Sequence, residues 1–119
     1  MNTTNNRQRR CLRGIELRYV LTMQLFQHGT ATIAELIEAL AHHGFCVNGR
    51  ASKAISDALR WERRYGRVYR RGRALYGPAQ MPRATEYRIH QRVMALRDEA
   101  DSLRGGRSGP NNPGAPPTG

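Results

Sequence analysis

The chain has 119 residues, about the length of one domain, which excludes a large multidomain enzyme. Its 20 Lys and Arg residues outnumber 9 Asp and Glu residues, so the formal net charge is +11, and Lys53 is the sole lysine. This excess favours acidic partners such as nucleic acid. No stretch is apolar enough to span a membrane and no apolar segment follows the first arginines, so we expect a cytoplasmic protein.

The two ends of the chain differ in composition from its middle. Residues 1–13 are polar and basic with no acidic residue, which predicts a flexible basic arm. Residues 105–119 are mainly Gly, Pro, Asn, Ser and Thr, and this composition predicts a disordered tail. Between them we expect a domain over residues 14–78 and a C-terminal helix within residues 79–104.

Cys11 and Cys46 are too few and too far apart for a disulfide framework or a four-ligand zinc cluster. We interpret both as reduced thiols. A metal site of His42, His43 and Cys46 is an alternative, since imidazoles and thiolates bind zinc and copper. The spacing of these residues matches no strong ligand pattern, so we predict no metal site and no cofactor.

Two helices are predicted in the first half of the domain. Residues 14–28 carry apolar side chains on two helical faces, which predicts that a second helix or a second subunit covers the far side. The second helix is predicted to begin after Thr32, because Thr32 and Glu35 match a capping box. Gly44 is well placed to end it.

A third helix is predicted over residues 51–65, and it sorts its side chains to two sides. Apolar residues such as Ile55 and Leu59 gather on the inner side. The side chains that lie roughly opposite are polar or basic, namely Ser52, Lys53, Ser56, Arg60, Arg63 and Arg64. Branched and aromatic residues on both sides of Gly72 then predict a β-hairpin with an arginine-rich tip.

The last predicted helix spans residues 84–104 and has apolar residues at heptad spacing. These residues are Ile89, Val93, Leu96, Ala100 and Leu103. Such a seam predicts a dimer interface, so we expect a homodimer. The alternative is that the seam packs back on the first helix of the same chain.

Basic residues are concentrated in residues 50–73, which contain nine of them against Asp57 and Glu62. Duplex DNA releases a condensed counterion for each phosphate that Lys or Arg neutralises, so a clustered basic face binds it far better than a scattered one. An ordinary solvated surface is the alternative, but it does not explain the clustering.

Three helices followed by a hairpin with a basic tip resemble the winged helix-turn-helix family over residues 30–77. Residues 52–60 look like its recognition helix, and Arg71-Gly72-Arg73 looks like its wing tip. The resemblance implies a mainly α fold with a small β-hairpin and an added C-terminal dimerisation helix. It implies major-groove contacts by Ser52, Lys53, Ser56 and Arg60, and minor-groove or backbone contacts by Arg70, Arg71 and Arg73. We add Arg63 and Arg64 to this predicted DNA-binding set.

Two carboxylates within the basic segment need separate explanations. Asp57 lies four residues after Lys53 and three before Arg60, so it either orders these cations or accepts from cytosine N4, and we favour the ordering role. Glu62 stands where the family commonly has an apolar residue. We expect Glu62 either to pair with an arginine such as Arg67 or to lie at the edge while Trp61 packs in its place.

The sequence therefore predicts a transcriptional regulator that binds specific duplex DNA and is associated with the nucleoid. A DNA-binding protein of architectural type, which grips phosphate without choosing sequence, is one alternative. An antitoxin-like protein-interaction module is another. The chain contains no phosphate-binding Gly-rich loop, nucleophile elbow or H-E-x-x-H motif, so we do not expect an enzyme.

Overall fold

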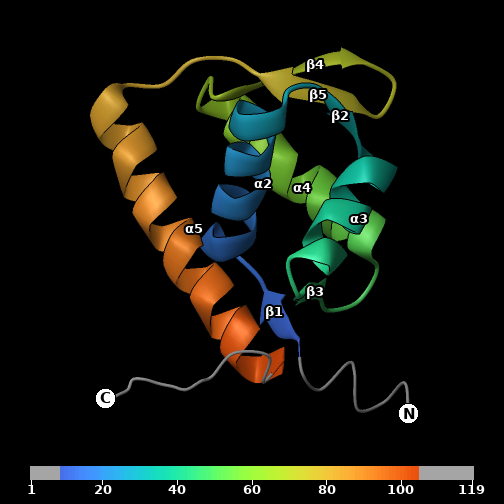
Figure 1. The fold of residues 1–119 in the computed structure, drawn as a ribbon. Coiled ribbons are helices and arrows are strands. Elements are labelled where there is room, and N and C mark those ends of the chain that lie inside the picture. The colour runs from blue at the N-terminus through green and yellow to red at the C-terminus, as the bar shows by residue number, and fades with distance from the viewer. Residues whose placement is uncertain (1–8, 105–119) are drawn as a thin grey trace.

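The structure is a computed structural model that describes residues 9–104 (Figure 1). Within these residues, four helices and a few short strands confirm a mainly α fold with a small β-hairpin. The elements in chain order are β1 (Arg10–Leu12), α2 (Ile15–His28), β2 (Ala31–Thr32), α3 (Ile33–His42), β3 (Phe45–Val47), α4 (Ala51–Arg64), β4 (Val68–Gly72), β5 (Leu75–Pro78) and α5 (Arg83–Arg104). The predicted tail and most of the predicted arm lie outside the described residues.

Helix α2 is the central element of the core. It packs against α4 on one side and α5 on the other (Figure 1). Leu17, Val20, Leu21 and Leu25 of this helix are buried. Helices α4 and α5 thus cover apolar side chains of α2 within one chain, while Ile15 at the start of α2 is 46% exposed.

Helix α5 corrects the prediction of a dimer interface. Four of the five predicted interface residues are almost completely buried within the chain, namely Ile89, Val93, Leu96 and Ala100. Leu103 is the exception, with 44% of its surface exposed. The alternative, that the seam packs back on the first helix, is confirmed for these four residues. Heptad spacing reveals that a helix has an apolar face, but not which helix covers it.

The strands form two small sheets among the described residues. In one, β1 pairs in parallel with β3; in the other, β5 lies between β2 and β4 with antiparallel pairing on both sides. The sheet of β2, β5 and β4 lies at the end of the molecule away from β1 (Figure 1). The hairpin therefore joins the helical core through β2, the short strand just before α3.

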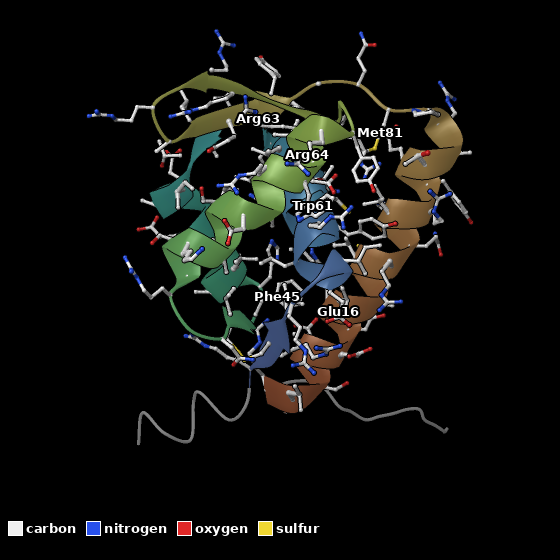
Figure 2. All side chains as sticks on the ribbon, turned by 180° about the vertical axis from the view of Figure 1, so that it is seen from behind. Glu16, Phe45, Trp61, Arg63, Arg64 and Met81 are labelled. Atoms are coloured by element: carbon white, nitrogen blue, oxygen red, sulfur yellow. A yellow bond between two sulfur atoms is a disulfide. The ribbon has the colours of Figure 1, made fainter. Side chains whose placement is uncertain are left out.

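Strand β1 shows that the prediction of a flexible arm is wrong for residues 10–12. Arg10 anchors this strand, because its Nε donates to Glu99 Oε1 at 2.7 Å and its Nη2 donates to Glu16 Oε2 at 2.8 Å. Glu16 lies at the start of α2 on the side that faces α5 (Figure 2). Composition suggested mobility, but these two ion pairs and the pairing with β3 hold the segment in place.

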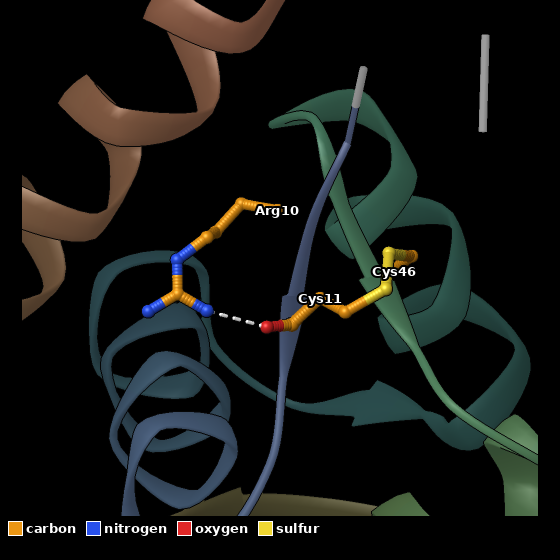
Figure 3. Close-up of a disulfide and its surroundings, with 3 residues drawn as sticks. All are labelled: Arg10, Cys11 and Cys46. Atoms are coloured by element: carbon orange, nitrogen blue, oxygen red, sulfur yellow. Dashed lines mark hydrogen bonds between the residues drawn. A yellow bond between two sulfur atoms is a disulfide. The ribbon is translucent and has the colours of Figure 1, made fainter. Parts of the chain in front are cut away.

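The prediction of two reduced thiols is also wrong, because Cys11 and Cys46 form a disulfide with an S–S distance of 1.98 Å (Figure 3). The two residues are register partners in the parallel pairing of β1 with β3. Parallel neighbours bring two side chains of the same face together, although 35 positions separate them in the sequence. The disulfide therefore fixes β1 to the strand that leads into α4.

The capping box and the glycine predicted for the two ends of α3 are both present in the structure. Thr32 Oγ1 accepts from the Glu35 backbone N–H at 3.1 Å and Glu35 Oε1 accepts from the Thr32 N–H at 2.8 Å, so the predicted capping box is confirmed. Gly44 follows α3 with φ +83°, a conformation that favours glycine. A Cβ at Gly44 would also lie 2.9 Å from Arg104 Nε, so a side chain there would displace the Arg104 guanidinium.

Candidate nucleic-acid interface

Helix α4 separates an apolar side from a basic side. Ile55 and Leu59 are completely buried, and Ala58 is nearly so. Because these residues fix the helix on the core, the opposite side faces solvent. The predicted DNA-binding residues on α4 are all exposed except Ser56, which is half-buried: Ser52, Lys53, Arg60, Arg63 and Arg64. The structure thus places the predicted residues of this helix on one outward face.

The hairpin of β4 and β5 presents the second group of predicted residues. Val68 and Tyr76 are buried and hold the hairpin against the core. Arg70, Arg71 and Arg73 are exposed around its turn. Arg70 Nε donates to the Gly72 carbonyl oxygen at 3.0 Å within β4, where the pairing with β5 is irregular. This bond holds the Arg70 side chain against the backbone of the tip. The side chains of Arg71 and Arg73 are exposed to solvent.

A groove of about 540 Å³ connects the two groups. Its lining consists of Arg60, Arg63, Arg64, Val68, Tyr69 and Arg70. Arg63 and Arg64 lie near the end of α4 next to the hairpin (Figure 2). The groove therefore brings four arginines from two elements around one concave surface. Ser52 and Lys53 lie at the other end of the helix, about 15 Å away at 1.5 Å per residue.

Asp57 lies midway along α4, at the edge of its basic face, and contacts Lys53 and Arg60. Its Oδ2 accepts from Lys53 Nζ at 3.0 Å, and its Oδ1 is 3.8 Å from Arg60 Nη2. The hydrogen bond from Lys53 lowers the pKa of the Asp57 carboxyl, so the group is charged at neutral pH. These contacts agree with the predicted ordering role.

Glu62 is completely buried on the inner side of the same helix. Arg67 donates to it twice, from Nε at 2.7 Å and from Nη2 at 3.0 Å, so the predicted pairing is confirmed. Trp61 remains 48% exposed and does not take its place in the core. Burial alone would raise the pKa of the Glu62 carboxyl, but hydrogen bonds from Arg67 and Arg18 outweigh it and lower the pKa.

Two further partners of Glu62 come from α2 and were missed by sequence reasoning. Arg18 Nε donates to Glu62 Oε2 at 2.9 Å, and Thr22 Oγ1 donates to Oε1 at 3.0 Å. Arg18 and Thr22 are four residues apart and therefore share one helical face, which is the only signal that the sequence offers. Glu62 thus ties α4 both to α2 and to the segment that leads into β4.

Exposed aromatic rings and arginines form a stacked group beside this ion-pair network, which sequence reasoning also missed. The guanidinium of Arg18 lies 5.7 Å from the ring centre of Trp61 and 5.3 Å from that of Tyr65. Arg64 lies 5.2 Å from the Trp61 ring. Cation–π contacts of this kind hold exposed rings in fixed orientations.

Within residues 9–104, no group of three or more His, Cys, Asp or Glu side chains is arranged to hold a metal ion. Cys46 is bound to Cys11, so its sulfur is not a thiolate ligand in this structure. The same part of the chain has no helix with the length and hydropathy of a bilayer-spanning segment.

Comparisons with protein-family models, with curated proteins and with solved structures give no significant match. The interpretation of the basic face therefore depends on the chemistry and placement of its own residues. Its defining features are the exposed side of α4, the hairpin arginines and the groove between them.

Proposed function

We propose that the protein is a winged helix-turn-helix DNA-binding protein that reads specific duplex sequences and regulates transcription. The order α2, α3, α4, β4, β5 supports this proposal, because the resemblance implies three helices followed by a hairpin.

The observation that carries the proposal is the continuous basic surface from α4 to the hairpin. An α-helix fits the major groove of B-DNA, which is about 12 Å wide. With α4 in that groove, Lys53 and Arg60 would reach guanine O6 and N7, and the hairpin arginines would lie along the adjacent backbone or minor groove. Arg63, Arg64 and Arg70, which line the groove beside Arg60, would then contact a phosphate strand.

Asp57 favours specific reading over architectural binding. A surface that only grips phosphate gains nothing from a carboxylate paired with two of its cations, because that charge repels the DNA backbone. A surface that reads bases gains fixed orientations for Lys53 and Arg60, the two side chains that Asp57 contacts. The proposal does not require a dimer, since the heptad seam of α5 is covered within the chain.

The test is selection from a randomised duplex pool, followed by fluorescence-anisotropy titrations across salt concentrations with competitor DNA. An enriched motif that resists competitor supports the regulator. Steep salt dependence without a motif supports the architectural alternative instead, and absence of binding at low salt overturns DNA binding and favours a protein partner.

Two matched arginine variants sharpen this test. Arg60→Ala should relax the preference at one base position at a cost of about 1 to 3 kcal/mol. Arg63→Ala should weaken binding to all sequences alike and reduce the salt slope by about one. If both variants weaken all sequences equally, α4 does not read bases and the specific proposal fails.

A further inference from the structure

A second groove lies on the other flank of α4, away from the hairpin. It has a volume of about 540 Å³ and is bounded by β1, the start of α2, β3 and α4. This volume is within the range of about 300 to 1,000 Å³ that is typical of sites for small molecules. The basic groove beside the hairpin shares none of its lining residues.

The lining of this groove is mostly apolar. Its main apolar residues are Leu12, Leu17, Val47, Ala58 and Trp61. Leu12, Leu17 and Ala58 belong to the buried core and form a rigid floor. Trp61 is half exposed and adds a flat wall, held in orientation by cation–π contacts with Arg18 and Arg64. A flat apolar molecule would pack against the floor and stack on the Trp61 ring.

The charged groups at the groove favour an anion. Arg13 and Arg18 both line it, and Asp57 is the acidic residue of the lining. Asp57 already contacts Lys53 and Arg60, and Arg18 is paired with Glu62, so the charges of both are compensated by partners. Arg13 forms no ion pair within the described residues and supplies the positive charge that favours an anion. Arg18 is held in place through its Nε by Glu62, which fixes the rest of its planar guanidinium beside the Trp61 ring.

We propose that this groove is a binding site for a flat aromatic molecule that carries one carboxylate. The ring would stack on Trp61 above the apolar floor, and the carboxylate would bind Arg13 and Arg18. This proposal does not depend on DNA binding, because the groove shares no lining residue with the basic groove beside the hairpin. The two grooves meet through Arg60 and Arg64, which contact Asp57 and Trp61 respectively.

The test is an NMR titration of the full chain with 2-naphthoate and, separately, with the neutral 2-naphthalenemethanol. Trp61 is the only tryptophan, so one indole N–H signal reports the site directly. We expect saturable shifts of this signal and of the Val47 amide with 2-naphthoate. The neutral analogue should bind about tenfold more weakly, the size expected for loss of one charge-assisted hydrogen bond.

Three variants separate this site from general anion binding to a basic protein. Arg13→Ala should weaken 2-naphthoate binding while affinity for the neutral analogue stays unchanged. Ala54→Leu should fill the groove and abolish binding of both, with circular dichroism confirming the fold. Arg83→Ala, an exposed arginine at the start of α5 outside the groove, should have no effect.

Three results would overturn the proposal. The first is the absence of saturable shifts at Trp61, and the second is equal affinity for the acid and the neutral analogue. The third is a loss in Arg83→Ala as large as that in Arg13→Ala, which would mean that 2-naphthoate responds only to overall charge.

Discussion

Glu62 and Arg67 form a two-point ion pair in which the carboxylate is completely buried, with N–O distances of 2.7 and 3.0 Å. The pair closes the turn between α4 and β4 and thereby couples the exposed helix to the hairpin. Because Arg18 and Thr22 also donate to Glu62, the same carboxylate holds α4 against α2. The relative position of the two predicted DNA-contacting elements therefore depends on one buried residue.

Replacing this carboxylate should destabilise the fold strongly. Glu62→Gln keeps the shape of the side chain but leaves two partly buried guanidinium groups without a counter-charge. We expect a loss of about 3 to 5 kcal/mol in the free energy of unfolding, measured by urea denaturation. Asp57→Asn on the exposed face is the control and should change stability little. A loss in Glu62→Gln no larger than in this control would show that the buried pair adds no net stability.

The contacts between these residues differ in whether the sequence could predict them. Thr32 and Glu35 lie three positions apart, so local geometry was enough to predict their contact. Glu62 and Arg67 lie five positions apart, and their pairing was one of two alternatives that the sequence predicted. Arg18 and Glu62 are 44 positions apart, and nothing in the sequence pairs them before the helices are packed. The sorting of α4 into apolar and basic sides was predictable because helical periodicity alone determines it.

Two of the three corrections, the α5 seam and the disulfide, have a common physical origin. The apolar seam of α5 and the cysteine pair were both visible in the sequence, but their partners were not. Val93 is buried against other elements of the same chain, and Cys11 meets Cys46 through a parallel strand pairing. Both depend on tertiary packing, which brings distant segments together and leaves no periodic signal.

The disulfide should make a large contribution to stability. Cys11 and Cys46 close a loop of 35 residues, and constraining the unfolded chain in this way is worth about 3 to 4 kcal/mol. We expect reduction by dithiothreitol to lower the urea midpoint accordingly. The double variant Cys11→Ser and Cys46→Ser should have the same urea midpoint as the reduced protein. Dithiothreitol should not change the midpoint of this variant. An identical midpoint with and without reductant in the unsubstituted protein would contradict this expectation.

Stability should fall in mild acid because of His43. Burial, helped by the charge of Arg97, lowers the pKa of the His43 imidazole to about 4. The ordinary value is about 6.5, so between these values the unfolded chain binds a proton that the folded chain does not. The free energy of unfolding should therefore drop as pH falls from 6.5 towards 4.

His43→Gln is the variant that tests this pH dependence, since glutamine is polar but does not titrate. Urea denaturation across this pH range should show a shallower slope in the variant than in the unsubstituted protein. His90→Gln, which replaces an exposed histidine of α5, is the matched control and should keep the original slope. Equal slopes in the unsubstituted protein and His43→Gln would refute the assignment to His43.

The covered seam of α5 predicts a monomer. Leu96→Ala should lower the free energy of unfolding by about 2 to 5 kcal/mol, because it leaves a cavity between α5 and the core. Leu103→Ala, at the exposed end of the same seam, should cost far less. Sedimentation equilibrium should give the mass of one chain for both variants and for the unsubstituted protein. A dimer that Leu96→Ala dissociates would show that the seam joins two chains in solution.

Under the proposed function, Asp57 should lower the affinity for arbitrary duplex DNA and increase the preference for the selected motif. Asp57→Asn removes a negative charge from the edge of the basic face, so binding to arbitrary duplex DNA should become tighter. Lys53 and Arg60 would at the same time lose the carboxylate that orients them, so the preference for the selected motif should shrink. Anisotropy titrations with the motif and with a scrambled duplex at equal salt measure both effects. Glu38→Gln removes one negative charge from an exposed position on α3 and controls for net charge. If both variants gain the same affinity for both duplexes, Asp57 does not orient the side chains that read bases.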